Sequence, residues 1–415
     1  MTIEHYKLSN GATVLIDPNP YAEQVSLSYF YRVGSRHERK HENGAAHFLE
    51  HMFFRGTEHR SSTKLKSEID DLGAQSGGMT GREFSSYSLT GKPDCLLYFN
   101  DLLVDMLVFP SISEKDVDIE RHAILQEMGE RREEYPSLAR ENVYSVAFPN
   151  SSFGTSISGS EANIETFTPD VLIGFKDRYY HAGNLIVCAA GNVDREMVLA
   201  DLHDVANYFP EGRLRYQRQP EYVGGAIHEV TGSKRLNLTL AFKSVAEKDI
   251  HAPALDMLSG VLAADSLMSS RLFREVREKR GLAYGITAFN AGGTDTGLFE
   301  ISTGTSADKG DELLSVISKE ITKLQNDPIS KKELARSKER YEAFMATLDP
   351  GAAYWFNFFG KPVEVPDLIQ AYDDVTVDDV MDAAQLVFSS APSLSTVGPE
   401  GSQPDYDKLV NALEM

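Results

Sequence analysis

The sequence contains few cysteines, which excludes one class of protein. Only Cys95 and Cys188 occur among the 415 residues. Two cysteines cannot form the disulfide framework of a small secreted domain, and they are compatible with a reducing compartment. The first residues, MTIEHYKLSNGATVLI, include no long apolar run, so the sequence predicts neither a signal peptide nor a transmembrane helix. We therefore expect a cytoplasmic protein.

Positive charge is also scarce. Lysine and arginine number 41 against 62 aspartates and glutamates, which gives a formal net charge of −21. This excess of negative charge argues against nucleic acid or an anionic membrane as the main partner. The length exceeds that of one ordinary hydrophobic core, so two domains of about 200 residues each are expected.

The segment HFLEH, residues 47–51, carries the clearest chemical signal. On a helix His47, Glu50 and His51 share one face. Two imidazoles one turn apart suit Zn²⁺, and a catalytic zinc takes three protein ligands and leaves its fourth position to water. Glu50 is then expected to act as the general base that takes a proton from that water.

An acidic segment from residue 113 to 134 predicts a helix that could supply the third ligand. Glu120 and Glu127 are seven residues apart, close to two helical turns, so both carboxylates fall on one face. Glu127 is the candidate third ligand. Glu120 is a candidate for orienting a ligand or water, and a solvated helix face is the competing interpretation.

The stretch GSRHERKHENGAAHFLEHMFFRGT, residues 34–57, together with IERHAILQEM around Glu127, resembles the inverted-motif H-x-x-E-H zinc peptidases. The resemblance is strongest to pitrilysin, insulysin and the mitochondrial processing peptidase, and it extends over nearly the whole chain. It implies one Zn²⁺ per chain, held by His47, His51 and Glu127, for the hydrolysis of peptides.

Two further segments gain meaning from this resemblance. In the family an edge strand beside the metal holds the substrate, and here its usual Asn-Ala pair is Gly77-Gly78, a departure that puts the substrate contacts in doubt. The segment SSRLFREVREKRGLAYG resembles the family's carboxy-terminal substrate-binding segment, which implies that Arg277 and Tyr284 stabilise the scissile peptide. Residue chemistry alone favours a charged surface helix followed by a buried tyrosine.

An internal repeat indicates how the chain is organised. The apolar alternation of residues 25–33 recurs at residues 236–242, and ISEKDV at 112–117 resembles ISKKEL at 329–334, an offset of 217 residues. That offset places Ser337 opposite Glu120 and Phe344 opposite Glu127. We therefore expect the metal site in the first half only.

The predicted fold class is α+β, with two homologous α/β-sandwich-like domains, each a mostly antiparallel sheet with helices packed on it. Basic residues, Pro220 and two glycines break the periodicity near residue 218, the pattern of a linker. The expected division is a zinc-binding catalytic domain at 1–212, a linker at 213–225 and a homologous metal-free domain at 226–415.

These features together predict a zinc metalloendopeptidase, and the resemblance implies that unfolded peptides are cleaved in an enclosed chamber. The alternative is a non-catalytic or weakly active subunit of a hetero-oligomeric complex similar to the processing peptidase. A purely structural zinc is disfavoured because such sites usually have four protein ligands. Because the chain carries both motifs, a homodimer is the more economical interpretation, and a heterodimer with a related subunit stays open.

Overall fold

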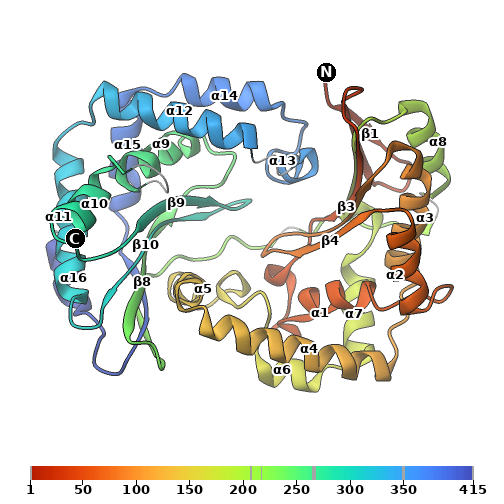
Figure 1. The fold of residues 1–415 in the computed structure, drawn as a ribbon, viewed down its shortest axis with the longest axis horizontal. Coiled ribbons are helices and arrows are strands. Elements are labelled where there is room, and N and C mark those ends of the chain that lie inside the picture. The colour runs from red at the N-terminus through yellow and green to blue at the C-terminus, as the bar shows by residue number, and fades with distance from the viewer. Residues whose placement is uncertain (1, 206–207, 216, 264–267, 348–350, 414–415) are drawn as a thin grey trace. The chain divides into compact units, whose positions relative to one another are not determined.

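The computed structural model describes residues 2–205, 208–215, 217–263, 268–347 and 351–413. These residues form two compact units, each built on one β-sheet (Figure 1). Unit 1 comprises Met1–Met128, Thr155–Arg218 and Pro350–Glu364, and unit 2 comprises Gly129–Gly154, Gln219–Asp349 and Val365–Met415. The domain division expected from the sequence, with its linker at 213–225, stays a prediction.

The sheet of unit 1 has the strand order β1-β2-β6-β3-β5-β4. Its strands are β1 (Glu4–Lys7), β2 (Thr13–Pro18), β3 (Val25–Tyr31), β4 (Gln75–Thr80), β5 (Ser85–Gly91) and β6 (Leu185–Gly191). Only β2 and β6 pair in parallel, and every other neighbouring pair is antiparallel. The expected edge strand is confirmed, because among the described residues β4 pairs with β5 alone.

Helices cover the face of this sheet to which the alternating apolar residues of β3 point. Val25, Leu27, Tyr29 and Tyr31 are buried in one core with Phe48 and other apolar residues of the helices. The helices of unit 1 are α1 (Ala45–Phe53), α2 (Ser62–Asp71), α3 (Leu96–Val108), α4 (Glu114–Glu133, which continues into unit 2), α6 (Glu161–Thr166), α7 (Pro169–Tyr179) and α8 (Arg195–Val205).

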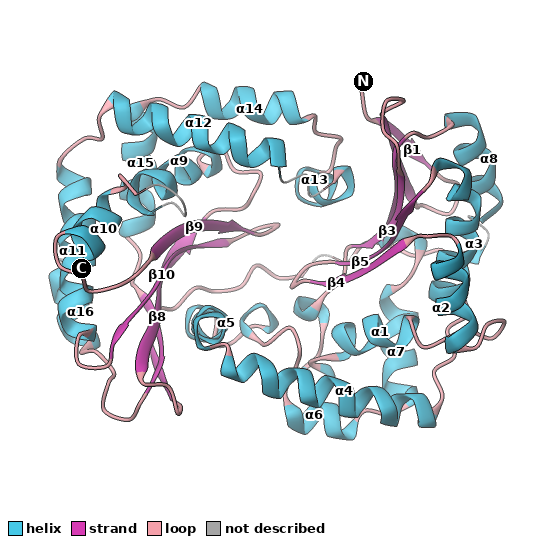
Figure 2. Ribbon diagram, in the orientation of Figure 1, coloured by secondary structure: helices cyan, strands magenta, loops and turns pink. Residues whose placement is uncertain are grey.

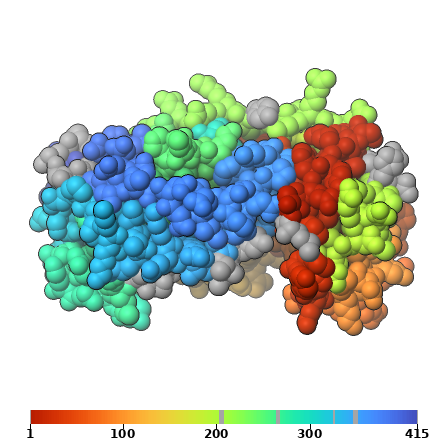
Figure 3. Space-filling model, turned by 90° about the horizontal axis from the view of Figure 1, so that it is seen from above, coloured from red at the N-terminus to blue at the C-terminus, as the bar shows by residue number. Residues whose placement is uncertain are grey.

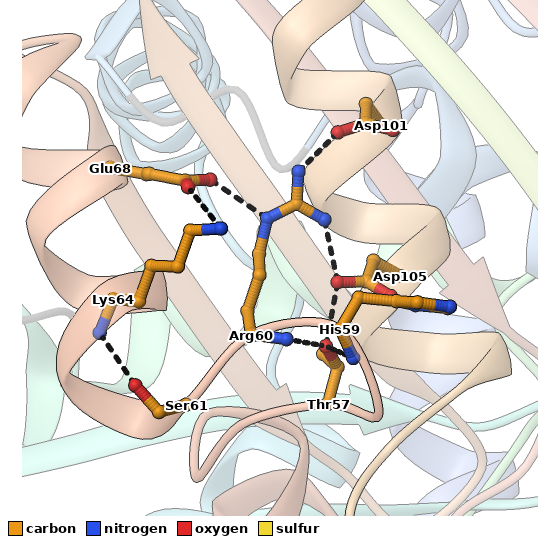
Figure 4. Close-up of polar contacts among 8 residues, drawn as sticks. All are labelled: Thr57, His59, Arg60, Ser61, Lys64, Glu68, Asp101 and Asp105. Carbon is orange, nitrogen blue, oxygen red and sulfur yellow. Dashed lines mark hydrogen bonds and ion pairs between the residues drawn. The ribbon is translucent and has the colours of Figure 1, made fainter.

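One arginine ties α2 to α3 (Figure 4). The guanidinium of Arg60 contacts Glu68 on α2 at 2.7 Å, and Asp101 and Asp105 on α3 at 2.5 and 2.6 Å. Asp105 is buried and also accepts a hydrogen bond from the Thr57 hydroxyl at 2.7 Å. Burial acts to raise the pKa of Asp105, but hydrogen bonds from its neighbours outweigh burial and hold it below its usual value. Thr57, His59 and Arg60 thus together favour the ionised form of this buried carboxylate.

Unit 2 repeats this architecture with the strand order β7-β11-β8-β10-β9 (Figure 2). Its strands are β7 (Gly225–Val230), β8 (Arg235–Ser244), β9 (Ile286–Gly292), β10 (Gly297–Ser306) and β11 (Ser393–Gly398). Its helices are α5 (Tyr135–Ala147), α9 (Ala252–Ala263), α10 (Arg271–Phe273), the π-helix η7 (Arg274–Glu278), α11 (Gly310–Asn326), α12 (Lys331–Thr347), α14 (Val365–Asp373), α15 (Val377–Phe388) and α16 (Tyr406–Ala412).

The two sheets confirm the predicted α+β class and the internal repeat. Again one pair, β7 with β11, is parallel and the other neighbouring pairs are antiparallel. The strands β2, β6, β3, β5 and β4 thus correspond in order to β7, β11, β8, β10 and β9. Helix α12 begins 217 residues after α4, from Glu114 to Lys331, as the repeated segment predicted.

Each unit also contains a helix from the other half of the chain. Helix α5 belongs to unit 2, where its Val143 and Ala147 pack with Ala241 and Leu298 of the sheet. Helix α13 (Ala352–Phe359) belongs to unit 1 and packs against β2 and β6, and in Figure 3 the blue segment that includes it borders the red N-terminal strands. An apolar face in the sequence indicates burial but does not identify the sheet that covers it.

Unit 2 contains two acidic side chains that burial makes less acidic. Burial raises the pKa of Asp256 and of Glu247, and the charge of Asp256 raises that of Glu247 further. Tyr372 donates a hydrogen bond to Asp256 at 2.7 Å.

Across the described residues, every helix is too short or too polar to span a bilayer.

Candidate metal site

A glycine, Gly44, precedes helix α1, and the side chain of another residue caps the helix. Gly44 has φ +105°, in the left-handed region that favours glycine, and it offers no capping side chain. The buried carboxylate of Glu38 takes that role, because it accepts hydrogen bonds from the backbone N–H groups of Gly44 and Ala46 and from the Asn43 amide, each at 2.8 Å. Burial raises the pKa of Glu38 to about 8, although the three hydrogen bonds favour its ionised form and act to lower the pKa. These bonds fix the first turn of α1, which contains His47.

The three predicted ligands lie together on two helices. His47 and His51 project from one face of α1, and Glu127 projects toward them from α4. The Nε2 atom of His47 lies 3.8 Å from Glu127 Oε1, and Nε2 of His51 lies 3.4 Å from Glu127 Oε2. One ligand atom from each residue lies within 4.8 Å of the other two. His47 is buried, whereas the other two are partly exposed, so the group is open on one side.

This donor set fits a catalytic zinc ion. Ligands at about 2.1 Å from a tetrahedral zinc lie about 3.4 Å from one another, which is close to the 3.8 and 3.4 Å between the imidazole nitrogens and the Glu127 oxygens. Two imidazoles and one carboxylate leave a tetrahedral metal one position for water. Within the ranges that the structure describes, this is the one group of three or more histidine, cysteine, aspartate or glutamate side chains whose ligand atoms converge in this way.

Glu120 contacts the ring nitrogen of His51 that faces away from Glu127. Its Oε2 lies 3.1 Å from Nδ1 of His51, so the opposite ring nitrogen is the one directed at Glu127. Arg55 lies 3.2 Å from the other oxygen of Glu120. Burial acts to lower the pKa of His51, but the two carboxylates outweigh it and raise the pKa to about 9. The surroundings of this imidazole therefore favour a positive charge, as a divalent cation would supply.

Glu50 lies on the same helix but outside the group of three. Its carboxylate faces the edge strand β4, where it accepts a hydrogen bond from the Thr80 hydroxyl at 2.5 Å. Figure 1 shows β4 passing over α1 within unit 1. This placement next to the candidate ligands is compatible with a base role.

Arg277 and Tyr284 form a contact in unit 2. Arg277 lies on the π-helix η7, and its guanidinium stacks on the Tyr284 ring at 4.4 Å and near the Phe273 ring at 5.0 Å. The Tyr284 side chain is 76% exposed, so it is not the buried tyrosine that residue chemistry alone favoured. Whether this pair contacts a peptide stays a prediction.

The second unit lacks the metal chemistry at the corresponding positions. Ser337 on α12, opposite Glu120 in the repeat, donates a hydrogen bond to the Met257 carbonyl of α9 at 2.9 Å. Phe344, opposite Glu127, is an exposed aromatic residue. The pairing of two helices is thus retained, while the residues between them differ.

Two contacts at this site were missed from the sequence. Glu38 gave no signal, because its role depends on the path of the loop before α1. Thr80 could have been found, because alternation along the strand places it on the same face as Gly78, which the sequence had already singled out.

Two family patterns match the chain. The family described as insulinase (peptidase family M16) matches residues 13–161, and the peptidase M16 inactive domain matches residues 166–341. The first match contains all three candidate ligands. The second begins after them, in agreement with the metal-free repeat.

Several relatives match over nearly their whole length. An "uncharacterized zinc protease" of Rickettsia felis is 29% identical over 401 residues, covering 95% of this chain and 97% of that protein. One of Bacillus subtilis is 26% identical over 409 residues, covering 97% of this chain and 100% of that protein. The mitochondrial-processing peptidase subunit beta of Blastocladiella emersonii is 26% identical over 429 residues, covering 99% and 91%.

A solved structure supports the fold. It is described as the peptidase M16 inactive domain from Pseudomonas fluorescens, and it superposes with a TM-score of 0.88 at 20% sequence identity, covering 98% of this chain and all of that one. The two family matches and the relatives identify the chain as a two-domain member of peptidase family M16, the insulinase family.

Proposed function

We propose that this protein is a zinc-dependent endopeptidase that hydrolyses unfolded peptides. The observation that supports this most strongly is the convergence of His47, His51 and Glu127, with Glu50 beside them on α1. The zinc proteases among the relatives support the choice of metal.

Each residue of the site has a defined task in this proposal. His47, His51 and Glu127 would hold the zinc, which when bound supplies a Lewis acid that makes water more acidic and polarises a carbonyl. Glu50 accepts the proton of the attacking water as the water oxygen bonds to the carbonyl carbon. It then gives that proton to the amine nitrogen as the carbon–nitrogen bond breaks, which returns Glu50 to its ionised form.

Arg277 and Tyr284 are proposed to contact the scissile peptide. The exposed tyrosine hydroxyl is a hydrogen-bond donor suited to the carbonyl oxygen, which becomes more negative in the transition state. The stacked guanidinium restricts the tyrosine ring and adds positive charge nearby.

An extended peptide is the substrate that the edge strand supports. In the part of the chain that the structure describes, β4 pairs with β5 alone, so a peptide strand could add to its open edge through backbone hydrogen bonds. The expectation of an enclosed chamber is tested by offering a stable folded domain, its denatured form and peptides of increasing length. Efficient cleavage of the folded domain at internal sites would contradict it.

We also propose that the protein acts as a homodimer. One chain carries both the H-x-x-E-H segment and the Arg277/Tyr284 segment, so catalysis does not require an unlike subunit. The relative named as a processing-peptidase subunit keeps a heterodimer as the alternative. Sedimentation of the purified chain, with and without candidate partner proteins, separates the two.

Variants of the site test the catalytic assignment. Glu50→Gln should keep about one zinc per chain and lose nearly all hydrolysis, because it removes the base and no ligand. His47→Ala, His51→Ala and Glu127→Ala should lose zinc as well as hydrolysis. Equal loss of zinc in Glu50→Gln would show that base and ligand are misassigned, and wild-type hydrolysis in that variant would rule out the proposed base.

A further inference from the structure

The edge strand β4 does more than offer an open edge to a peptide. Gly78 and Thr80 are two residues apart on β4, so they lie on the same face of the strand, and both meet Glu50 of α1. The Thr80 hydroxyl must be the donor in its 2.5 Å hydrogen bond to Glu50 Oε2, because an ionised carboxylate can only accept.

Gly78 leaves open the space that the Glu50 side chain occupies. A Cβ atom at position 78 would lie 2.9 Å from Glu50 Oε1 and 3.0 Å from the edge of the Phe54 ring. Contacts under 3.0 Å force an atom to move, and the end of the glutamate is the more movable neighbour. The glycine that replaces the family's usual alanine thus allows the carboxylate to lie directly against the strand.

We propose that Thr80 is a positioning residue for Glu50 and that Gly78 sets the room in which Glu50 is held. The inference rests on the proposed function. A hydrogen bond to a charged group is about twice as strong as a neutral one, and it fixes the direction of the carboxylate as well as its place. The strand expected to align the peptide therefore also aligns the group that takes the proton, so substrate and base share one strand as their support.

The alternative is that Thr80 merely stabilises the fold. A structural role would lower thermal stability in any variant without the hydroxyl, and it would not single out the rate of the chemical step. A positioning role lowers kcat while it leaves KM and zinc content nearly unchanged, because the base misaligns but neither the metal ligands nor the strand edge is altered.

The test compares Thr80→Val, which keeps the shape and removes the donor, with Thr80→Ser, which keeps the donor. Thr80→Val should lower kcat by about tenfold to a hundredfold with KM changed less than about threefold, and Thr80→Ser should retain most of the rate. Thr90→Val is the matched control, because it removes a threonine hydroxyl that bonds Ser26 in the same sheet at 2.9 Å. Equal kinetics in Thr80→Val and wild type, or equal losses in Thr80→Val and Thr80→Ser, would overturn the proposal.

A double-mutant cycle separates positioning of the base from other effects. In the Glu50→Gln background, Thr80→Val should cause no further loss of rate, because the base that it positions is already absent. An additional loss as large as the one in the wild-type background would contradict the proposal.

Crystal structures of the zinc-loaded protein supply a readout that does not depend on turnover. The wild type should keep Glu50 within hydrogen-bond distance of Thr80, and Gly78→Ala should displace the carboxylate while α1 and the three candidate ligands stay in place. A wild-type Glu50 that turns away from Thr80 would refute the inference even if the protein is a peptidase. A zinc-loaded wild type that cleaves no peptide would instead refute the proposed function.

Discussion

Replacing Glu120 by alanine tests how the site holds its metal. The carboxylate lies 3.1 Å from Nδ1 of His51, and its partner Arg55 lies 3.2 Å away on the other side. A hydrogen bond to a charged group contributes about 1.5–3 kcal/mol, and about 1.4 kcal/mol corresponds to tenfold in Kd. Loss of the hydrogen bond between Glu120 and His51 should therefore weaken zinc binding by about 10- to 100-fold, which is the range found when a group that orients a metal-bound histidine is removed.

The assay is competition for zinc between the protein and a chelator of known affinity. Glu120→Gln should lose less affinity than Glu120→Ala, because the amide oxygen can still accept the imidazole hydrogen. Asp116→Asn is the matched control, because Asp116 lies one turn earlier on α4 and 3.5 Å from Arg55 but makes no contact with His51 in the structure. If Glu120→Ala binds zinc as tightly as the wild type, Glu120 is a solvated residue of α4 and the reasoning fails.

Three further predictions concern other parts of the molecule. Arg60→Leu should lower the free energy of unfolding of unit 1 by about 3 kcal/mol in a denaturant titration, because the buried carboxylate of Asp105 loses the Arg60 charge. Lys64→Met removes only an exposed ion pair and should cost less than about 0.5 kcal/mol in the same titration. Equal effects of the two substitutions would contradict this prediction. Tyr284→Phe should lower kcat about a hundredfold with zinc retained, if its hydroxyl stabilises the transition state, and wild-type kinetics would leave the segment a structural one. Because burial raises the pKa of Glu247 above its unfolded value, the contribution of Glu247 to stability is full below about pH 4.5 and is lost as the pH rises through the folded pKa of about 8. At pH 9 the Glu247→Gln variant should therefore be more stable to unfolding than the wild type. If the variant and the wild type show the same pH dependence of stability, the raised pKa of Glu247 is refuted.

The sequence predicted the parts of this fold that depend on local spacing. Helical spacing placed His47 and His51 on one face, and the seven-residue interval placed Glu120 and Glu127 on one side of α4. The repeated segment predicted that α12 corresponds to α4. Each of these depends on the periodicity of a single element or on a similarity between two, both of which are visible in the residues themselves.

Other features depend on how distant segments meet, which spacing alone does not determine. The sequence left open whether Glu120 faces solvent, and the packing of α4 on α1 brings it to His51. The exchange of α5 and α13 between the units could not be predicted, because an apolar face does not name its partner. Gly78 was noted as a departure from the family's usual alanine. Only the structure shows that the Glu50 side chain lies in the space that a Cβ atom at position 78 would enter.

Removal and return of the metal tests the central claim most directly. The purified protein, stripped by a chelator and assayed on unfolded peptides, should be inactive. Titration with Zn²⁺ should restore hydrolysis in proportion to the metal bound, up to about one zinc per chain. Hydrolysis that persists without metal, or a zinc-loaded protein that cleaves no unfolded peptide, would contradict the account.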